Sequence, residues 1–303
     1  MTFLAGTRGS KLAWTQTGHA LAELARRLPD APAFERLRID TRGDRDQHTP
    51  LATLSGTGLF TKELEAALLR GEIALAVHSL KDVPYDVAPG TSLFLLERED
   101  PRDALLTPHG GLDRLPQGAH VGTGSPRRIA QLKARRPDLR FSDLRGNLDT
   151  RLKRLDDGDF DAIVLASAGL ERLGWADRIA ERLDPDLCLP AFGQGVLALQ
   201  CLSSRSDIVD MLLRAEDPAA ALAARLERHL MKALGGGCKR ALAALAEVGP
   251  TSVRVRGAVG DPRQGRVVRR LWEGPIAGSE AAMDELARGL LEDAALAGLD
   301  ADA

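Results

Sequence analysis

The chain has 303 residues, of which 44% are hydrophobic and 28% are charged. This composition excludes collagen-like and disordered classes, and the length predicts two or three compact domains. Basic and acidic residues nearly cancel, 41 against 43, which disfavours a general electrostatic surface for nucleic acid or membrane. The sequence has no signal-peptide pattern and no apolar run long enough to span a bilayer, so we expect a cytoplasmic protein.

Short apolar runs alternate with helical patterns through the first two thirds of the chain. Such alternation is typical of α/β layers, so two α/β units are expected up to about residue 195. The predicted buried strands are residues 73–77 and 162–166, and the predicted helices are 10–28, 60–70, 125–136 and 147–157.

The pattern changes after Asp217-Pro218. A long helix to Leu234, a glycine triplet and a β-like stretch follow, and together they predict a smaller α+β domain. Its clearest elements are strands near 253–259 and 266–272 and a closing helix at 279–296.

Arginines stand beside the predicted N-caps of three helices. The segments are Thr7-Arg8-Gly9-Ser10, Ser125-Pro126-Arg127-Arg128 and Arg145-Gly146-Asn147 with Arg151. Cations at a helix N-terminus oppose the helix dipole, so the repeated layout favours an external anion over solvated surface arginines. The sequence contains no complete nucleotide-binding loop, and several separate sites suit a ligand with several carboxylates better than one pyrophosphate.

Lys81 and Asp82 follow the predicted strand 73–77, at the sheet edge where α/β proteins bind ligands. Pro84 biases Val83 towards an extended backbone, which fixes the turn that carries Asp82. Asp82 either pairs with Lys81 or an arginine, or it steadies a developing cation and moves protons.

The three cysteines and six scattered histidines support neither a disulfide framework nor a metal site. Cys188 and Cys201 have apolar neighbours in the sequence and are expected in the core. Cys238 follows three glycines and precedes Lys239-Arg240, which would lower the pKa of a thiol. It is either a reactive thiol or part of a flexible linker.

Several segments, in this order, resemble the porphobilinogen deaminase (hydroxymethylbilane synthase) family. They are Thr7-Arg8-Gly9-Ser10, Thr41-Arg42-Gly43-Asp44, His78-Ser79-Leu80-Lys81-Asp82-Val83-Pro84, Arg98-Glu99-Asp100-Pro101-Arg102-Asp103, Ser125-Pro126-Arg127-Arg128, Leu144-Arg145-Gly146-Asn147, Phe192-Gly193-Gln194-Gly195 and Gly236-Gly237-Cys238. The resemblance runs from residue 7 to residue 238.

The resemblance implies two α/β domains like those of type II periplasmic binding proteins, and a smaller C-terminal α+β domain. The first domain would comprise residues 1–97 with 196–215, the second 98–195 and the third 216–303. Hinges would lie near residues 96–100 and 190–195.

The resemblance also implies a transferase of tetrapyrrole and haem biosynthesis. It would join four porphobilinogen molecules head to tail into hydroxymethylbilane, with release of ammonia at each step. A dipyrromethane cofactor would be attached to Cys238 through a thioether, and the protein would be a monomer with no nucleic-acid or membrane partner.

Site residues carried over from the resemblance fall into four groups. Asp82, with Lys81, would be catalytic. Asp82, Lys81, Thr123, Ser125, Arg127 and Arg128 would hold the cofactor, and Arg8, Ser10, Arg145, Arg151, Arg172 and Gln194 the substrate rings. Phe60 would belong to a mobile loop over the site. The chain departs from the family pattern at Leu4, Thr53, Thr57, Gly235 and Lys239-Arg240-Ala241.

A non-catalytic carboxylate-binding protein on the same hinged architecture is the alternative from another class. Such a protein would need the arginines, but it would have no use for Asp82 or for a modified Cys238. A nucleic-acid binder with Arg-rich helices is disfavoured by the balanced charge.

Overall fold

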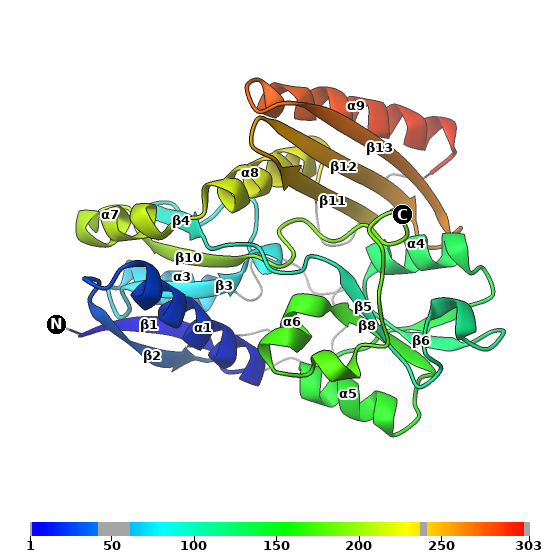
Figure 1. The fold of residues 1–303 in the computed structure, drawn as a ribbon, viewed down its shortest axis with the longest axis horizontal. Coiled ribbons are helices and arrows are strands. Elements are labelled where there is room, and N and C mark those ends of the chain that lie inside the picture. The colour runs from blue at the N-terminus through cyan, green and yellow to red at the C-terminus, as the bar shows by residue number, and fades with distance from the viewer. Residues whose placement is uncertain (1, 42–60, 237–240, 300–303) are drawn as a thin grey trace.

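The computed structural model describes residues 2–41, 61–236 and 241–299. Two α/β domains lie side by side, and a smaller domain with a three-stranded sheet packs against both of them (Figure 1). The expected fold class, two periplasmic-binding-protein-like α/β domains followed by an α+β domain, is confirmed. Within the described ranges, no helix combines the length and the apolarity needed to cross a bilayer.

The first domain is built on a sheet of order β2-β1-β3-β10-β4. β1, β2 and β3 run parallel, whereas β10 runs antiparallel to both β3 and β4. Alternate residues of β3 enter two cores: Leu75 and Val77 pack with residues of α1 and α7, and Ala76 packs with residues of α3. The elements are β1 (Thr2–Arg8), β2 (Ala33–Ile39), β3 (Leu75–Ser79), β4 (Thr91–Leu95), β10 (Leu197–Leu202), α1 (Lys11–Arg27), α3 (Lys62–Leu69), α7 (Ser206–Ala215) and the 3-10 turn η1 (Leu80–Asp82).

The second domain repeats this arrangement with the order β7-β6-β8-β5-β9. β6 runs parallel to β7 and β8, and β5 runs antiparallel to β8 and β9. Its elements are β5 (Asp103–Leu106), β6 (His120–Gly122), β7 (Arg140–Ser142), β8 (Ala162–Ala166), β9 (Glu181–Arg182), α4 (Pro126–Arg135), α5 (Leu148–Asp156), α6 (Ser167–Arg172) and the turns η2 (Leu112–Arg114) and η3 (Ala176–Arg178).

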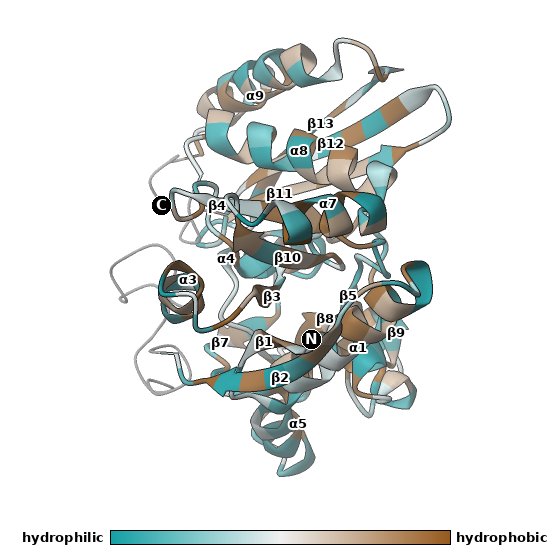
Figure 2. Ribbon diagram, turned by 90° about the vertical axis from the view of Figure 1, so that its left-hand side faces the viewer, coloured by the Kyte–Doolittle hydropathy of each residue, from teal (hydrophilic) through white to brown (hydrophobic). Residues whose placement is uncertain are grey.

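Figure 2 contrasts an interior strand with an outer helix by hydropathy. β10, inside the first sheet, is largely brown and buried along nearly its whole length. α5, on the outside of the second domain, is largely teal and fully buries only Leu152.

Two chain segments, near residues 96–99 and 195–197, connect the α/β domains and lie side by side; we call them the crossover segments. The Leu96 amide donates to the Leu197 carbonyl at 3.0 Å, and the Glu99 amide donates to the Gly195 carbonyl at 3.1 Å. β10 therefore returns the chain to the first sheet after the second domain is complete.

The third domain is an antiparallel meander, β11-β12-β13, packed on two helices. Alternation along β11 separates two faces: Leu242, Ala244 and Ala246 join the core with α8 and α9, whereas Ala243 and Leu245 contact Leu189 of the second domain. The elements are α8 (Pro218–Ala233), β11 (Ala241–Val248), β12 (Ser252–Asp261), β13 (Arg266–Pro275) and α9 (Ser279–Leu296).

Candidate functional site

Lys81 and Asp82 form the 3-10 turn η1 directly after the buried strand β3, as predicted. The turn closes with a 3.0 Å hydrogen bond from the Val83 amide to the Leu80 carbonyl. Val83 then adopts an extended backbone, φ −86° and ψ 124°, as expected before Pro84. The sequence thus places both polar side chains at the end of a rigid strand.

The side chain of Lys81 is accessible to water, yet the surrounding protein lowers its pKa to about 8. Desolvation is the main cause; the charges of Arg127 and Arg128 lower the pKa further, whereas Asp82 and Asp103 raise it. Because α4 carries both arginines, Lys81 lies within electrostatic reach of the second domain.

Arg127 and Arg128 are both buried at the start of α4. The predicted N-cap is confirmed, because Ser125 Oγ accepts from the Arg128 amide at 3.4 Å and Pro126 occupies the first turn. Thr123 Oγ1 accepts from the Ser125 amide at 3.3 Å, which links β6 to this cap.

The two guanidinium groups meet at the carboxylate of Asp103, which is wholly buried. Arg127 Nη1 lies 2.6 Å from Oδ2, and Arg128 Nη2 lies 2.7 Å from Oδ1. Burial alone would raise the pKa of Asp103, but the two arginines outweigh it and hold that pKa far below its usual range. We expected these arginines to face a ligand, and the structure brings both onto a carboxylate of the protein itself.

Gln194 and Cys188 complete the Asp103 cluster. Gln194 Nε2 donates to Asp103 Oδ1 at 3.0 Å and to the Pro101 carbonyl at 2.7 Å. Cys188 Sγ lies 3.4 Å from Asp103 Oδ2 and 3.8 Å from Arg127 Nη1. The expectation that Cys188 lies in the core is confirmed, because it belongs to the hydrophobic cluster of the second domain, although its thiol also contacts these charged groups. The same expectation holds for Cys201, which lies in the core of the first domain.

Asp103 is not predicted as a site residue, because a sequence shows which residues are charged but not which of them form ion pairs in the folded protein. It belongs to the segment Arg98–Asp103, and the signal was a lone acid at the start of an apolar strand, Asp103–Leu106, buried along its length. Such an acid requires cationic partners inside the protein.

Arg151 and Arg145 lie at the start of α5, within electrostatic reach of each other and of Arg128. Burial lowers the pKa of Arg151 to about 10, and the charges of Arg128 and Arg145 add to this, whereas Asp82 and Asp143 oppose it. Arg151 Nε donates to the Gly146 carbonyl at 2.8 Å. Arg145 Nε is buried and has no hydrogen-bond partner among the described residues. Asn147 occupies the N-cap position without a side-chain cap bond.

Arg8 and Ser10 lie where β1 passes into α1. Ser10 Oγ accepts from the Ala13 amide at 3.2 Å, so the predicted N-cap is confirmed. The positive charge of Arg8 lowers the pKa of His78, and the negative charge of Asp82 raises it. Both groups therefore lie within electrostatic reach of β3.

Arg172 lies at the crossover segments. Its Nε donates to Glu99 Oε1 at 3.0 Å, and its Nη2 donates to the Gly195 carbonyl at 2.9 Å. Phe60 and Cys238 fall outside the described residues.

Among the described residues around the turn that carries Asp82, cations outnumber carboxylates. Asp103 balances Arg127 and Arg128 only in part, and Lys81, Arg145 and Arg151 share Asp82 and Asp143. This excess of positive charge suits an anionic ligand with several carboxylates. Among the described residues, no three His, Cys, Asp or Glu side chains gather as metal ligands would.

Family models and curated relatives that match this chain all belong to one family. The family model described as porphobilinogen deaminase, dipyromethane cofactor binding domain, matches residues 3–210, and that described as porphobilinogen deaminase, C-terminal domain, matches residues 221–292. A porphobilinogen deaminase of Bordetella parapertussis is 47% identical over 291 residues, covering 95% of this chain and 92% of that protein. One from Syntrophotalea carbinolica is 44% identical over 300 residues, covering 97% and 95%.

Solved structures of transport proteins also match. The second substrate-binding domain of an amino acid ABC transporter from Streptococcus pneumoniae aligns with a TM-score of 0.44 and 11% sequence identity, covering 71% of this chain and 91% of that one.

Proposed function

The chain belongs to the porphobilinogen deaminase family, so it is a transferase that joins four porphobilinogen molecules into hydroxymethylbilane; we propose that Asp82 is its catalytic carboxylate and Cys238 its cofactor attachment site. The observation that carries the proposal is the position of Asp82. It stands at the end of a rigid strand, within reach of the cations Lys81 and Arg151.

The residues present fit a dipyrromethane group that bears carboxylate side arms. The unpartnered buried Nε of Arg145 and the lowered pKa of Lys81 mark cations that a ligand carboxylate would stabilise. Bound there, dipyrromethane supplies the free ring carbon to which the first substrate ring is joined.

Attachment at Cys238 is supported by the state of the other two cysteines. Cys188 and Cys201 are wholly buried, and burial raises the pKa of their thiols to about 12 and about 11. Both thiols therefore stay protonated and inaccessible, which makes them poor nucleophiles.

The proposed role of Asp82 follows from the charge that develops in the reaction. When the amino group of the aminomethyl side chain leaves as ammonia, its methylene carbon stays on the substrate ring, which becomes electron-poor, and a carboxylate beside the ring N–H stabilises that positive charge. The ring carbon that forms the new bond must then lose a proton, which Asp82 can accept.

The remaining cations hold the acid side arms of the rings. We assign Lys81, Thr123 and Ser125 to the cofactor, with Arg127 and Arg128 contributing the donors that Asp103 and the carbonyls of Leu189 and Val164 leave free. Arg8, Ser10, Arg145 and Arg151 are assigned to the incoming and preceding rings. Arg172 and Gln194 hold the crossover segments, about which the α/β domains would move as the chain of rings grows.

We also propose that the protein works in the cytoplasm as a monomer, with porphobilinogen as its partner and without nucleic acid or membrane. Light scattering during gel filtration of the purified protein tests the monomer, which requires a mass near 32.5 kDa.

Substitution Asp82→Asn, with intact-mass measurement, tests the proposed function. The variant should keep the mass excess of a covalent dipyrrole, which Cys238→Ala should lack, while turnover falls by about 100-fold or more. Asp86→Asn is the matched control, because Asp86 is exposed on the same loop. Normal turnover of a cofactor-loaded Asp82→Asn protein would overturn the role of Asp82. A wild-type protein at its bare mass and without turnover would favour the carboxylate-binding alternative.

A further inference from the structure

One guanidinium group holds the backbone that follows Asp82. Arg228, on α8 of the third domain, donates from Nη1 to the Val83 carbonyl at 3.3 Å and from Nη2 to the Pro84 carbonyl at 2.7 Å. The same Nη2 also donates to the Tyr85 carbonyl. Three consecutive carbonyls therefore converge on one side chain that comes from another domain.

This segment has little regular structure of its own. It lies between η1 and β4 without helix or strand geometry, and Pro84 has no amide hydrogen to donate. Its backbone position consequently depends on side chains that reach it from elsewhere.

The face of α8 that carries Arg228 contacts the turn at further points. Ala224, one helical turn before Arg228, packs in one apolar cluster with Leu80 and Val83, which flank Lys81 and Asp82. The Tyr85 ring lies 5.5 Å from the Arg228 guanidinium carbon and 4.8 Å from Lys232 Nζ, measured to the ring centroid. α8 thus touches the chain on both sides of Asp82.

α8 also leads to the cofactor. It ends at Ala233, a few residues before Cys238, so one helix carries both the contacts to the Asp82 turn and the approach to the attachment site. In Figure 1, α8 lies between the first domain and the sheet of the third.

We infer that Arg228 is a positioning residue, which fixes the Asp82 carboxylate relative to the third domain and hence to the group attached there. The inference rests on the proposed role of Asp82. Its physical basis is that a catalytic group displaced by about 1 Å loses about 100-fold in rate. The α/β domains would move during elongation. The hydrogen bonds from Arg228 of α8 would then keep Asp82 at a constant position relative to the cofactor attachment site.

The test compares Arg228→Gln, Arg228→Lys and the control Arg225→Gln in the cofactor-loaded enzyme. Arg225 lies on the same helix, is exposed, and pairs with Glu280 at 3.3 Å. Amide hydrogen exchange of residues 82–88 should quicken in Arg228→Gln and stay unchanged in Arg225→Gln. kcat should fall about 10-fold to 100-fold with KM within about twofold, because the cations that hold substrate acids are untouched.

Two further measurements keep the outcome decisive. In Arg228→Ala, millimolar guanidinium should restore part of kcat, and Arg228→Lys, which retains a single donor group, should fall between Gln and wild type. Unchanged exchange at 82–88 in Arg228→Gln, or a kcat equal to that of Arg225→Gln, would overturn the inference. A failure of the proposed function is detected by a different measurement, namely normal turnover of the Asp82→Asn variant. That outcome would not change the hydrogen-exchange result for Arg228→Gln.

Discussion

Asp103 concentrates the electrostatics of the second domain in one buried carboxylate. Two arginines and Gln194 donate to it, and none of these three residues is more than 7% exposed. The substitution Asp103→Asn removes the only negative charge among these four residues. We expect it to lower the free energy of unfolding by about 3–5 kcal/mol, measured by urea denaturation, because two guanidinium groups lose their buried counter-charge.

Asp113→Asn is the control for this change. Asp113 also pairs with an arginine, Arg135 at 3.0 Å, but its side chain is 70% exposed. An exposed ion pair contributes less than about 1 kcal/mol. If the two variants lost equal stability, the buried cluster would not be the reason for the effect.

His78 gives the fold a pH dependence of its own. Its Nε2 lies 3.0 Å from Gln200 Oε1, and Gln200 Nε2 donates to Thr91 Oγ1 and to Glu65 Oε1. Burial lowers the pKa of His78 from 6.5 to about 4. Between these values the unfolded chain binds the proton and the folded chain does not, so stability falls as the pH drops from 6.5 towards 4.

The histidine's share of this loss is about 3 kcal/mol at pH 4. The measurement is the free energy of unfolding at several pH values between 4 and 7, compared with that of His78→Gln, which should lose less stability over the same interval. The exposed His109 provides the control variant His109→Gln, whose pH profile should follow the wild type. A His78→Gln profile parallel to the wild type would contradict the assignment.

Among the elements, those that begin and end with local signals could be predicted from the sequence. α4, with Ser125 before Pro126, and α9 lie within one residue of the predicted bounds. β3 begins at Leu75 rather than at residue 73, because the apolar run extends before the paired strand. Contacts between distant segments could not be predicted: neither Asp103 as the partner of Arg127 nor Arg228 as the positioning residue leaves a local pattern.

The crossover at Gly195 depends on the absence of a side chain. Gly195 has φ +89°, and an added Cβ would lie 2.5 Å from the Glu99 carbonyl oxygen. Gly195→Ala should therefore destabilise the protein by more than about 3 kcal/mol, from backbone strain and from the clash with the neighbouring crossover segment. Thermal or urea unfolding measures the change.

Gly71→Ala separates these two causes. Gly71 has φ +71°, but an added Cβ would meet nothing within 4 Å, so only the backbone strain of about 1–2 kcal/mol remains. Equal effects of the two substitutions would show that close packing at the crossover contributes nothing.

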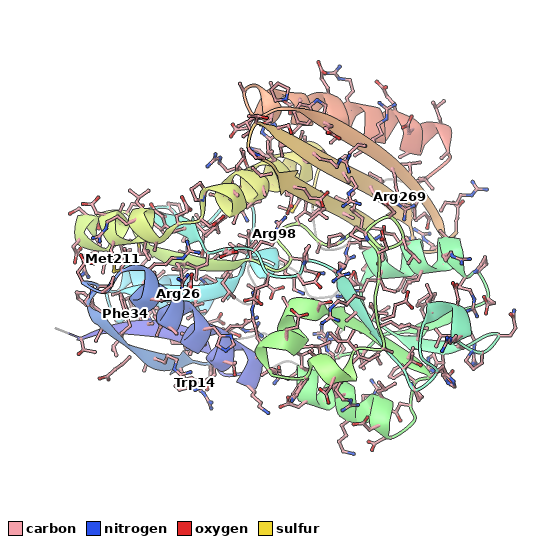
Figure 3. All side chains as sticks on the ribbon, viewed as in Figure 1. Trp14, Arg26, Phe34, Arg98, Met211 and Arg269 are labelled. Carbon is pink, nitrogen blue, oxygen red and sulfur yellow. The ribbon has the colours of Figure 1, made fainter. Side chains whose placement is uncertain are left out.

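At the scale of the whole molecule, the third domain is attached to both α/β domains. Arg269 of β13 donates to Gln131 Oε1 at 3.1 Å and to the Leu187 carbonyl at 3.0 Å in the second domain. Arg98 comes from the crossover and lies close to the place where the three domains meet, and Figure 3 labels both arginines. Arg269 thus ties the third sheet directly to the second domain.

Glu227 of α8 is the centre of this junction. It is wholly buried and accepts from Arg98 Nη1 at 2.7 Å, Arg98 Nη2 at 2.9 Å, the Gly193 amide at 2.7 Å and the Ala246 amide at 2.8 Å. Oε1 accepts from Arg98 and from Ala246 of the third sheet, and Oε2 accepts from Arg98 and from Gly193. Both crossover segments and the third sheet therefore meet at this one carboxylate.

Glu227→Gln should lower the free energy of unfolding by about 3–5 kcal/mol. An amide has one acceptor oxygen and would turn its NH₂ group towards donors, while the largely buried Arg98, whose side chain is 13% exposed, would lose its counter-charge. Urea denaturation measures this loss, and hydrogen exchange of residues 193–196 and 241–248 should quicken together. Glu280→Gln, whose exposed partner is Arg225, should change stability by less than about 1 kcal/mol. Faster exchange confined to β11, with residues 193–196 unchanged, would contradict a single junction, because Glu227 accepts from both segments at once.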